Sequence, residues 1–175
     1  MNDVINAMID RRSCRSFKSD MPSSEDLDAI VEAGLYAANG MGKQSPIVLK
    51  VTNKELRDRL SKMNAQIMGA PEGTDPFYGA PAVLVVLASA DAPTAVYDGS
   101  LTMGNMMLAA ESLGLASIWI HRAKEEFESE EGKAILAELG VEGSYIGIGH
   151  CVVGYRDGEK PAPAARRGGR VFVAE

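Results

Sequence analysis

The sequence predicts an α+β fold that forms a single domain over residues 1–175. Segments with helical and with strand periodicity follow one another without the regular strand–helix–strand rhythm of a parallel sheet. Gly147, Gly149 and Gly154 lie within a strand pattern and not at a strand-to-helix turn, so they form no dinucleotide-binding fingerprint. A length of 175 residues, 46% of them hydrophobic, fits one core of ordinary size.

The first half of the chain predicts three helices and one strand. Apolar residues recur at helical spacing over residues 4–9, 27–38 and 54–69, and Ser23 or Ser24 is the expected cap of the second helix. Residues 47–52 read as a strand. Residues 70–79, which contain Pro71, Gly73, Asp75 and Pro76, predict a loop.

The second half predicts more strands and a central helix. Residues 82–87 lack polar alternation, which is typical of a strand buried on both faces. The helix expected at 97–113 is apolar on several sides, so it should be central or lie at a subunit interface. We further expect strands at 117–121 and 145–155, a charged helix at 125–139, and a last short strand at 171–173 after a tail with little core of its own.

Composition excludes several classes of function. A net charge of -6 and a pI near 5.0 disfavour nucleic acid and anionic membranes as partners, because both attract basic surfaces. No secretory signal is evident at residues 1–9, and the apolar stretch 80–90 is too short to span a bilayer, so we expect a cytoplasmic protein. The two cysteines form no disulfide framework. His150 and Cys151 are strand neighbours that point to opposite faces, so no metal site is expected.

Two clusters suit a phosphorylated ligand. Residues 11–17 contain Arg11, Arg12 and Arg15 with two hydroxyls, and guanidinium forks suit a phosphate dianion. The alternative is that these arginines complement the negative end of the first helix. Arg166 and Arg167 lie in the tail, where arginines usually belong to a solvated surface.

Two further clusters suit an aromatic ring with polar edges. The loop 37–46 offers Asn39 and Gln44, whose amides both donate and accept, as the edge of a flavin ring demands; any helix-to-strand loop also favours such residues. Trp119 and His121 stand together at a strand end, where ligand contacts are common. The alternative is a core tryptophan and a surface histidine.

Taken in order, these motifs resemble the flavin nitroreductase family along essentially the whole chain. The opening Arg-Arg-Ser-x-Arg-x-Phe pattern is complete over residues 11–17. A small-residue loop ends in Gln44. The long-helix pattern Asp-x-Ser-x-x-x-x-Asn-x-x-x-Ala-Ala-x-x-x-Gly-Leu is present from Asp98 to Leu115. Two features depart from the family: Ser45 intervenes before Pro46, and His121-Arg122 replaces the Glu-Gly that some relatives carry.

The resemblance implies a homodimer that binds FMN at the subunit interface. It also implies a central mixed or antiparallel sheet flanked by helices, with the C-terminal tail strand exchanged or packed at that interface. Three groups of residues would bind the cofactor: the arginine-rich segment and the tail around the phosphate, the loop from the partner subunit, and the strand end beside the ring. The implied cofactor-binding residues are Arg11, Arg12, Ser13, Arg15, Asn39, Met41, Gln44, Ile118, Trp119, Ile120, His121, Arg166 and Arg167.

The implied activity is ping-pong reduction of nitroaromatics, quinones or similar small acceptors, with NADH or NADPH as electron donor. The flavin supplies the redox chemistry, so no catalytic side chain is required; His121 is the candidate for such a role. Two alternatives stay open. One is a flavin-binding sensor or storage protein without turnover. The other is a dehalogenase-type relative, which the short chain disfavours because such proteins often insert a lid.

Overall fold

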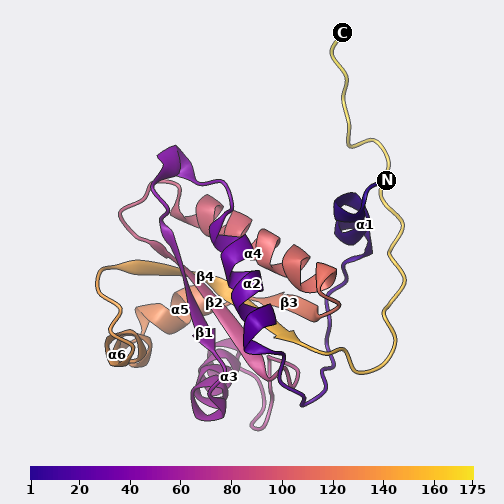
Figure 1. Cartoon of the computed structure of the whole chain (residues 1–175). Coiled ribbons are helices and arrows are strands. Elements are labelled where there is room, and N and C mark those ends of the chain that lie inside the picture. The colour runs from indigo at the N-terminus through magenta and orange to yellow at the C-terminus, as the bar shows by residue number, and fades with distance from the viewer.

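The computed structural model describes residues 1–175 and contains a four-stranded antiparallel sheet with helices on both faces (Figure 1). The strands are β1 (Pro46–Val51), β2 (Ala82–Ser89), β3 (Ala116–Ile120) and β4 (Tyr145–Gly154). Their order is β1-β2-β4-β3, so β1 and β3 are the outer strands. The α+β class and the antiparallel sheet are therefore confirmed.

The helices divide between the two faces of the sheet. α2 (Ser24–Leu35) and α4 (Ala95–Ser112) pack on one face, and α1 (Asp3–Asp10) lies against α4. α3 (Lys54–Met68), α5 (Ala123–Glu128) and α6 (Glu130–Glu138) pack on the other. None of these helices is both long enough and apolar enough to cross a membrane.

The two apolar layers meet at β2, which is buried on both sides as predicted. Val83, Val85 and Leu87 face α3, α5 and α6, whereas Leu84 and Val86 face α2 and α4. Each large side chain buried this way contributes about 1.5–3 kcal/mol of hydrophobic free energy. The core therefore fixes the middle of the sheet, and the outer strands β1 and β3 pair with it.

Local sequence signals explain where the helices begin and end. The Ser23 hydroxyl accepts a hydrogen bond from the Asp26 amide at 3.0 Å, which caps α2. The Asn53 side chain caps α3 by accepting from the Leu56 amide at 2.9 Å. Gly69 ends α3 with a φ of 68°, a left-handed conformation that glycine adopts without strain.

Three expectations need correction. The helix expected at 125–139 is two helices, because Ser129 has an extended backbone and its hydroxyl accepts from the Gly132 amide to start α6. α2 ends at Leu35 and not at residue 38. Residues 171–173 form no strand in the single chain: they are exposed and pair with no neighbour, and a strand requires a hydrogen-bonded partner. The whole tail leaves the body of the protein (Figure 1).

Candidate functional site

The segment after α1 passes along the outer edge of β3. Ser13 pairs in parallel with Ser117 of β3, and the Cys14 amide donates to the Ser117 carbonyl at 3.1 Å. Further along, Phe17 pairs with Arg156 beyond the end of β4. Because β3 is an outer strand, its edge beyond Ser117 has no neighbouring strand. We call residues 11–17 together with this open edge of β3 the cationic edge.

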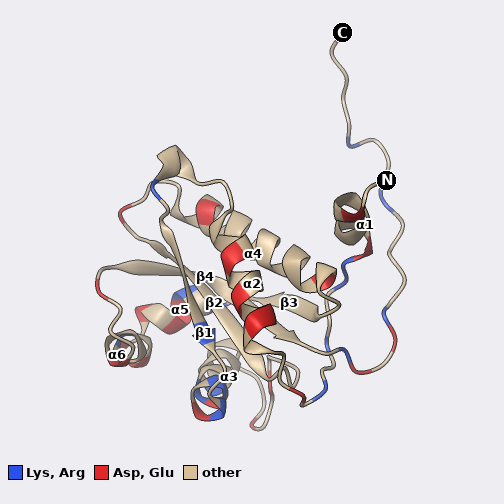
Figure 2. Ribbon diagram, viewed as in Figure 1, with Lys and Arg blue, Asp and Glu red and all other residues tan.

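The arginines of the cationic edge have no acidic partner. None of Arg11, Arg12 and Arg15 forms an ion pair with Asp or Glu. Arg11 is half-buried, and its buried Nη1 has no hydrogen-bond partner. Arg15 is exposed. Figure 2 shows basic residues in blue on the segment after α1, in a chain that is acidic overall. A dianion would satisfy these groups.

Arg12 differs from its neighbours because its guanidinium is engaged by the backbone. Its Nη1 donates to the Ile9 carbonyl at 2.6 Å and to the Arg11 carbonyl at 2.7 Å, at the end of α1. This geometry matches the alternative interpretation, in which an arginine complements the negative end of the helix. Its Nε is buried without a partner.

The positive charge of Arg11 also reaches Cys151 on β4. Burial raises the pKa of the Cys151 thiol to about 12, and the Arg11 cation opposes that rise. The thiol is therefore protonated at neutral pH and behaves as a small buried apolar group. As expected for strand neighbours, Cys151 packs on the α4 face, whereas His150 contacts Phe77 on the α3 face at a ring separation of 5.1 Å.

The end of β3 presents two stacked aromatic rings. The ring centroids of Trp119 and His121 are 5.5 Å apart with an interplanar angle of 25°. The indole lies over Gly149 of β4, where an added Cβ would come within 2.0 Å of the indole Nε1. That Nε1 is buried and has no hydrogen-bond acceptor. A buried donor without a partner at an open strand edge is typical of a site that a ligand completes.

Ile118 and Ile120 contribute to this edge differently. Both side chains are buried on the opposite face, in the core shared with α3 and α5. Only their backbone groups can therefore contact a ligand beside β3. The bulge in β4 lies next to them: Val86 pairs with Gly149 and Leu87 with Gly147, which leaves Ile148 as an extra residue. Bulges of this kind often occur beside functional sites.

The loop before β1 is held in an unusual backbone conformation. Met41 and Gln44 have φ values of 55° and 50°, which side-chain-bearing residues rarely adopt. The Asn39 Oδ1 accepts from the Gln44 amide at 2.8 Å. Asn39 and Gln44 line a hollow of about 270 Å³ beside the end of α2, whereas Met41 is 76% exposed.

Asp98 of α4 holds this loop, a role that its place in the motif did not reveal. Its Oδ1 accepts from the Gly40 amide at 2.9 Å, and its Oδ2 accepts from Ser45 Oγ at 2.7 Å and from Thr94 Oγ1 at 2.9 Å. The Ser45 hydrogen bond is the main cause that lowers the pKa of Asp98, so the carboxylate stays charged. A buried carboxylate with three donors indicates a rigid loop.

Within one chain, the candidate residues form two separate groups. The cationic edge and the end of β3 lie at one side of the sheet, and the loop with Asn39, Met41 and Gln44 leads into β1 at the other. Three strand spacings separate these edges, a distance of about 14 Å. Arg166 and Arg167 lie in the exposed tail, where no hydrogen bond or ion pair connects them to either group.

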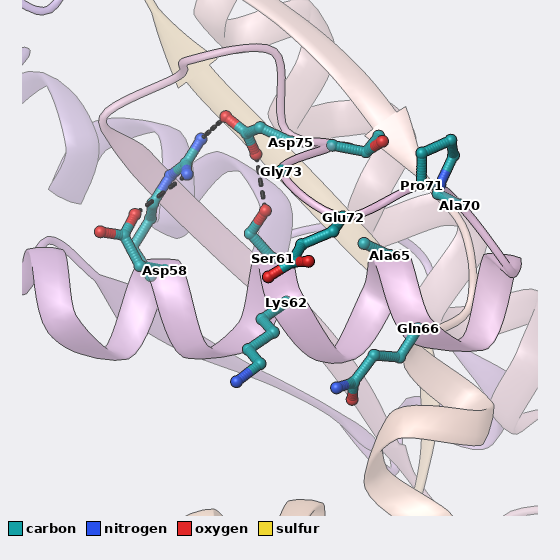
Figure 3. Close-up of a pocket in the computed structure, with 12 residues that line it drawn as sticks. Asp58, Ser61, Lys62, Ala65, Gln66, Ala70, Pro71, Glu72, Gly73 and Asp75 are labelled. Carbon is teal, nitrogen blue, oxygen red and sulfur yellow. Dashed lines mark hydrogen bonds and ion pairs between the residues drawn. The ribbon is translucent and has the colours of Figure 1, made fainter.

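A larger hollow lies elsewhere, between α3 and residues 70–75 (Figure 3). Its volume is about 650 Å³, and none of the candidate residues lines it. Asp75 fills its hydrogen-bonding capacity there: it accepts from Arg57 Nη2 and Ser61 Oγ, each at 2.6 Å, and from the Phe77 and Gly79 amides. We interpret this cluster as a structural anchor of the loop 70–79, because its polar groups are already paired.

The sequence profile of the Nitroreductase family matches residues 8–155. The chain belongs to the nitroreductase family. Two solved nitroreductases with bound FMN, from Bacteroides fragilis NCTC 9343 and Desulfitobacterium hafniense DCB-2, superpose with TM-scores of 0.89 at 29% and 30% identity. In both comparisons all of this chain and all of the other are covered.

Sequence relatives agree with this family assignment. An Archaeoglobus fulgidus protein assigned as a NADH dehydrogenase/NAD(P)H nitroreductase is 26% identical over 165 residues, which is 91% of this chain and 89% of that protein. A shorter match, 35% identical over 63 residues, covers only 25% of an FMN reductase [NAD(P)H] of Bacillus subtilis. The nitroreductase fold and the family resemblance expected from the sequence are therefore confirmed.

Proposed function

We propose that this nitroreductase-family chain is an FMN-dependent oxidoreductase that takes electrons from NADH or NADPH and reduces a small oxidised acceptor. The observation that carries the proposal is the set of unpaired donors along the cationic edge. Arg11 Nη1, in the segment that pairs with β3, and Trp119 Nε1, on β3 itself, are both buried without a partner. Phosphate at one end and a polar-edged ring at the other would satisfy both.

The phosphate of FMN would bind at Arg11, Ser13 and Arg15. The Ser13–Ser117 bridge fixes the backbone of this segment. The charges of Arg11 and Arg15 are not neutralised by any acid. A tail arginine, Arg166 or Arg167, would add to this group once the tail is ordered. Arg12 would act through the end of α1, because its Nη1 already binds two carbonyls.

The ring would lie beside Trp119, His121 and the backbone of residues 118–121. When bound, FMN supplies hydride acceptance at N5 and its later release to the acceptor. The protein supplies position and electrostatics: the strand edge offers backbone donors and acceptors, and the Trp119–His121 stack offers a flat apolar surface. Donor and acceptor would exchange at this surface in a ping-pong sequence. Nitroaromatics and quinones are the proposed acceptor classes.

A second copy of the chain would complete the site. Asn39, Met41 and Gln44 lie on the far side of the sheet from the cationic edge, so a partner subunit would supply them to the same ring. Large apolar side chains are exposed on α1, on α4 and in the tail, including Met8, Tyr97 and Phe172. Burial of these surfaces in a homodimer would stabilise it.

The absorbance spectrum of the purified protein tests the cofactor. Bands near ~375 and ~450 nm that persist after gel filtration are expected for bound flavin. A colourless protein that takes up no added FMN would contradict the proposal.

Turnover separates the enzyme from the sensor. Steady-state oxidation of NADH and NADPH is measured with menadione, a nitroarene and a halogenated phenol as acceptors. Reduction of the first two is expected. Bound FMN without turnover over the whole panel would favour the sensor, and turnover of the halogenated compound alone would favour the dehalogenase-type alternative.

A further inference from the structure

Three polar side chains from three elements meet in the interior beneath the end of β3. Asn64 of α3, Glu126 of α5 and His150 of β4 each have no exposed surface. His150 Nε2 lies 2.7 Å from Glu126 Oε2, and Asn64 Nδ2 donates to Glu126 Oε1. Buried groups of this kind are costly unless all are paired, so their joint presence calls for a reason.

Both ring nitrogens of His150 face acceptors. Nδ1 lies 3.3 Å from the Ile120 carbonyl, and Nε2 faces the Glu126 carboxyl. A single proton shared between the imidazole and the carboxyl satisfies this arrangement and leaves the buried pair neutral overall. The pair can therefore persist in the core and hold Asn64 in place.

The cluster reaches the backbone of the turn that follows β3. Asn64 Nδ2 donates to the His121 carbonyl at 2.8 Å, and Arg122 Nε donates to Asn64 Oδ1 at 2.9 Å. With the contact from His150 to the Ile120 carbonyl, side chains of the cluster hold three consecutive residues. Nothing else in the chain hydrogen-bonds the His121 carbonyl or the Arg122 side chain.

The turn needs such support because Arg122 is strained. Its φ is 77°, in the left-handed region that a residue with a Cβ rarely adopts. A non-glycine residue stays in this region only where the surroundings determine it, and such positions gather at functional sites. The turn starts α5 directly after His121, at the edge where the flavin ring would lie.

We propose that Asn64, Glu126 and His150 are positioning residues that hold the backbone of residues 120–122 against the flavin ring. The proposal rests on the proposed function for the identity of the ring. The other part of the proposal, that the cluster supports the strained turn, does not depend on the identity of any ligand. The cluster binds no ligand itself: it acts through the backbone of the turn. Arg122 is the residue of that turn whose backbone is strained.

The first experiment compares Arg122→Ala with Arg122→Gly. Both variants lose the bond to Asn64, but only alanine keeps a Cβ in the left-handed conformation. We expect hydrogen exchange of the peptide spanning residues 119–124 to quicken by ~10-fold or more in R122A, and by less than ~3-fold in R122G. Exchange is measured on the full chain before and after addition of FMN. Equal exchange in the two variants would overturn the role of strain.

The second experiment removes the anchor. Asn64→Ala should quicken exchange of the same peptide, and Ser61→Ala is the matched control. Ser61 lies on the same helix and also loses a side-chain hydrogen bond, but a part-buried one to Asp75, so exchange should change in residues 70–79 and not at 119–124. A uniform rise over the whole chain in N64A would mean general destabilisation and would contradict positioning.

The third experiment reads the flavin. In N64A we expect a shift of the ~450 nm band and a ~10-fold slower reduction by NAD(P)H at saturating donor, with FMN affinity changed by less than ~3-fold, because the phosphate contacts remain. When R122G is already present, the N64A change should slow reduction much less. The double variant should therefore be nearly as fast as R122G alone. An unshifted band with an unchanged rate would overturn the proposal. Wild-type chain that binds no FMN would instead overturn the proposed function and leave the exchange results valid.

Discussion

The Ser45 hydroxyl donates a hydrogen bond of 2.7 Å to Asp98, and this bond joins the loop before β1 to the central helix α4. The serine is the residue that separates Gln44 from Pro46, which is a departure from the usual family pattern. The structure shows that the added residue is buried and used. Its carbonyl also accepts from the Ser89 amide at 3.0 Å, so the residue ties the loop to β2 as well.

Ser45→Ala should therefore loosen the loop and weaken FMN retention. Asp98 keeps its bonds from Gly40 and Thr94, so the fold is expected to survive. One lost hydrogen bond to a carboxylate should raise the dissociation constant of FMN by ~3- to 30-fold. Fluorescence titration of the flavin-free protein measures it. Ser100→Ala is the control. Ser100 lies on α4, as Asp98 does, but its hydroxyl donates only to a carbonyl one turn earlier in that helix. Equal losses in both variants would remove Ser45 from the site.

Arg15→Ala should lower FMN retention more strongly. Arg15 is exposed, has no acidic partner and follows the Ser13–Ser117 bridge, so its charge is available for a phosphate. We expect the dissociation constant to rise ~10- to 100-fold, with little effect on riboflavin, which lacks the phosphate. Lys18→Ala, a change of an exposed cation three residues away, is the control for general electrostatics. Similar losses for FMN and riboflavin would argue against a phosphate contact.

The sequence predicted the elements that follow local periodicity and missed contacts between distant segments. Helices, strands and their order could be read because apolar spacing reports which face is buried. Asp98 was visible in a motif, but its partners Gly40 and Ser45 lie more than fifty residues away. Asn64 and Glu126 gave no signal, because each lies on a charged helix and only the fold shows that it points inward.

The same reasoning explains the wrong expectations. Residues 125–139 have one continuous pattern of charge, and the break at Ser129 depends on a close approach that the pattern does not encode: a Cβ at Gly132 would come within 2.1 Å of the Glu126 carbonyl. The strand expected at 171–173 has strand-like residues but no partner within the chain. Periodicity indicates that a segment can be buried, but it does not indicate what would bury it.

Gly149→Ala should displace the indole from the end of β3. An added Cβ would lie 2.0 Å from Trp119 Nε1, so the ring must move toward solvent. We expect a loss of stability of about 1–3 kcal/mol, which is typical of overpacking. Because Trp119 is the only tryptophan, its fluorescence should shift to longer wavelength. Trp119→Phe, which removes the orphaned donor but keeps a ring, should leave stability closer to wild type. An unshifted emission spectrum in G149A would show that the indole does not lie over Gly149.

Asp75→Asn should destabilise the loop 70–79 without altering the flavin site. The change removes the charge that pairs with Arg57, a side chain that is itself buried. We expect a loss of about 1–3 kcal/mol in the free energy of unfolding, measured by urea denaturation. The flavin spectrum should be unchanged, since the cluster is separate from the cationic edge. A shifted flavin band in this variant would contradict that separation.

The same variant should show a defined pH dependence. Burial tends to raise the pKa of Asp75, but hydrogen bonds from Arg57, Ser61 and the Gly79 amide outweigh it, so the pKa is lowered. A carboxyl with a lowered pKa contributes stability in full above its unfolded pKa of about 3.9, and the contribution is lost as pH falls through the folded value. The difference between wild type and D75N should be constant from about pH 5 to 7 and shrink below about pH 4. A difference that grows on acidification would reverse the assigned direction.

Leu101→Asp should dissociate the proposed homodimer and release FMN together. Tyr97 and Leu101 lie one turn apart on α4 and are 72% and 50% exposed, which is unusual for apolar residues of a central helix. Burying an unpaired carboxylate at a subunit interface costs about 2–5 kcal/mol, so self-association should weaken by more than tenfold. Sedimentation velocity over a range of concentrations measures the dissociation, and absorbance near ~450 nm in the same run reports the flavin.

The control for this change is Leu139→Asp, which places the same charge at a similarly exposed leucine, 48% accessible, after α6 on the other face of the sheet. It should remain dimeric and yellow, because α6 carries no part of the proposed interface. If the loop residues Asn39, Met41 and Gln44 reach the ring only from a partner, monomer formation and loss of FMN must occur at the same concentration. A monomeric L101D that retains FMN at wild-type affinity would mean that one chain holds the cofactor alone, and the two groups of candidate residues would then not share a site.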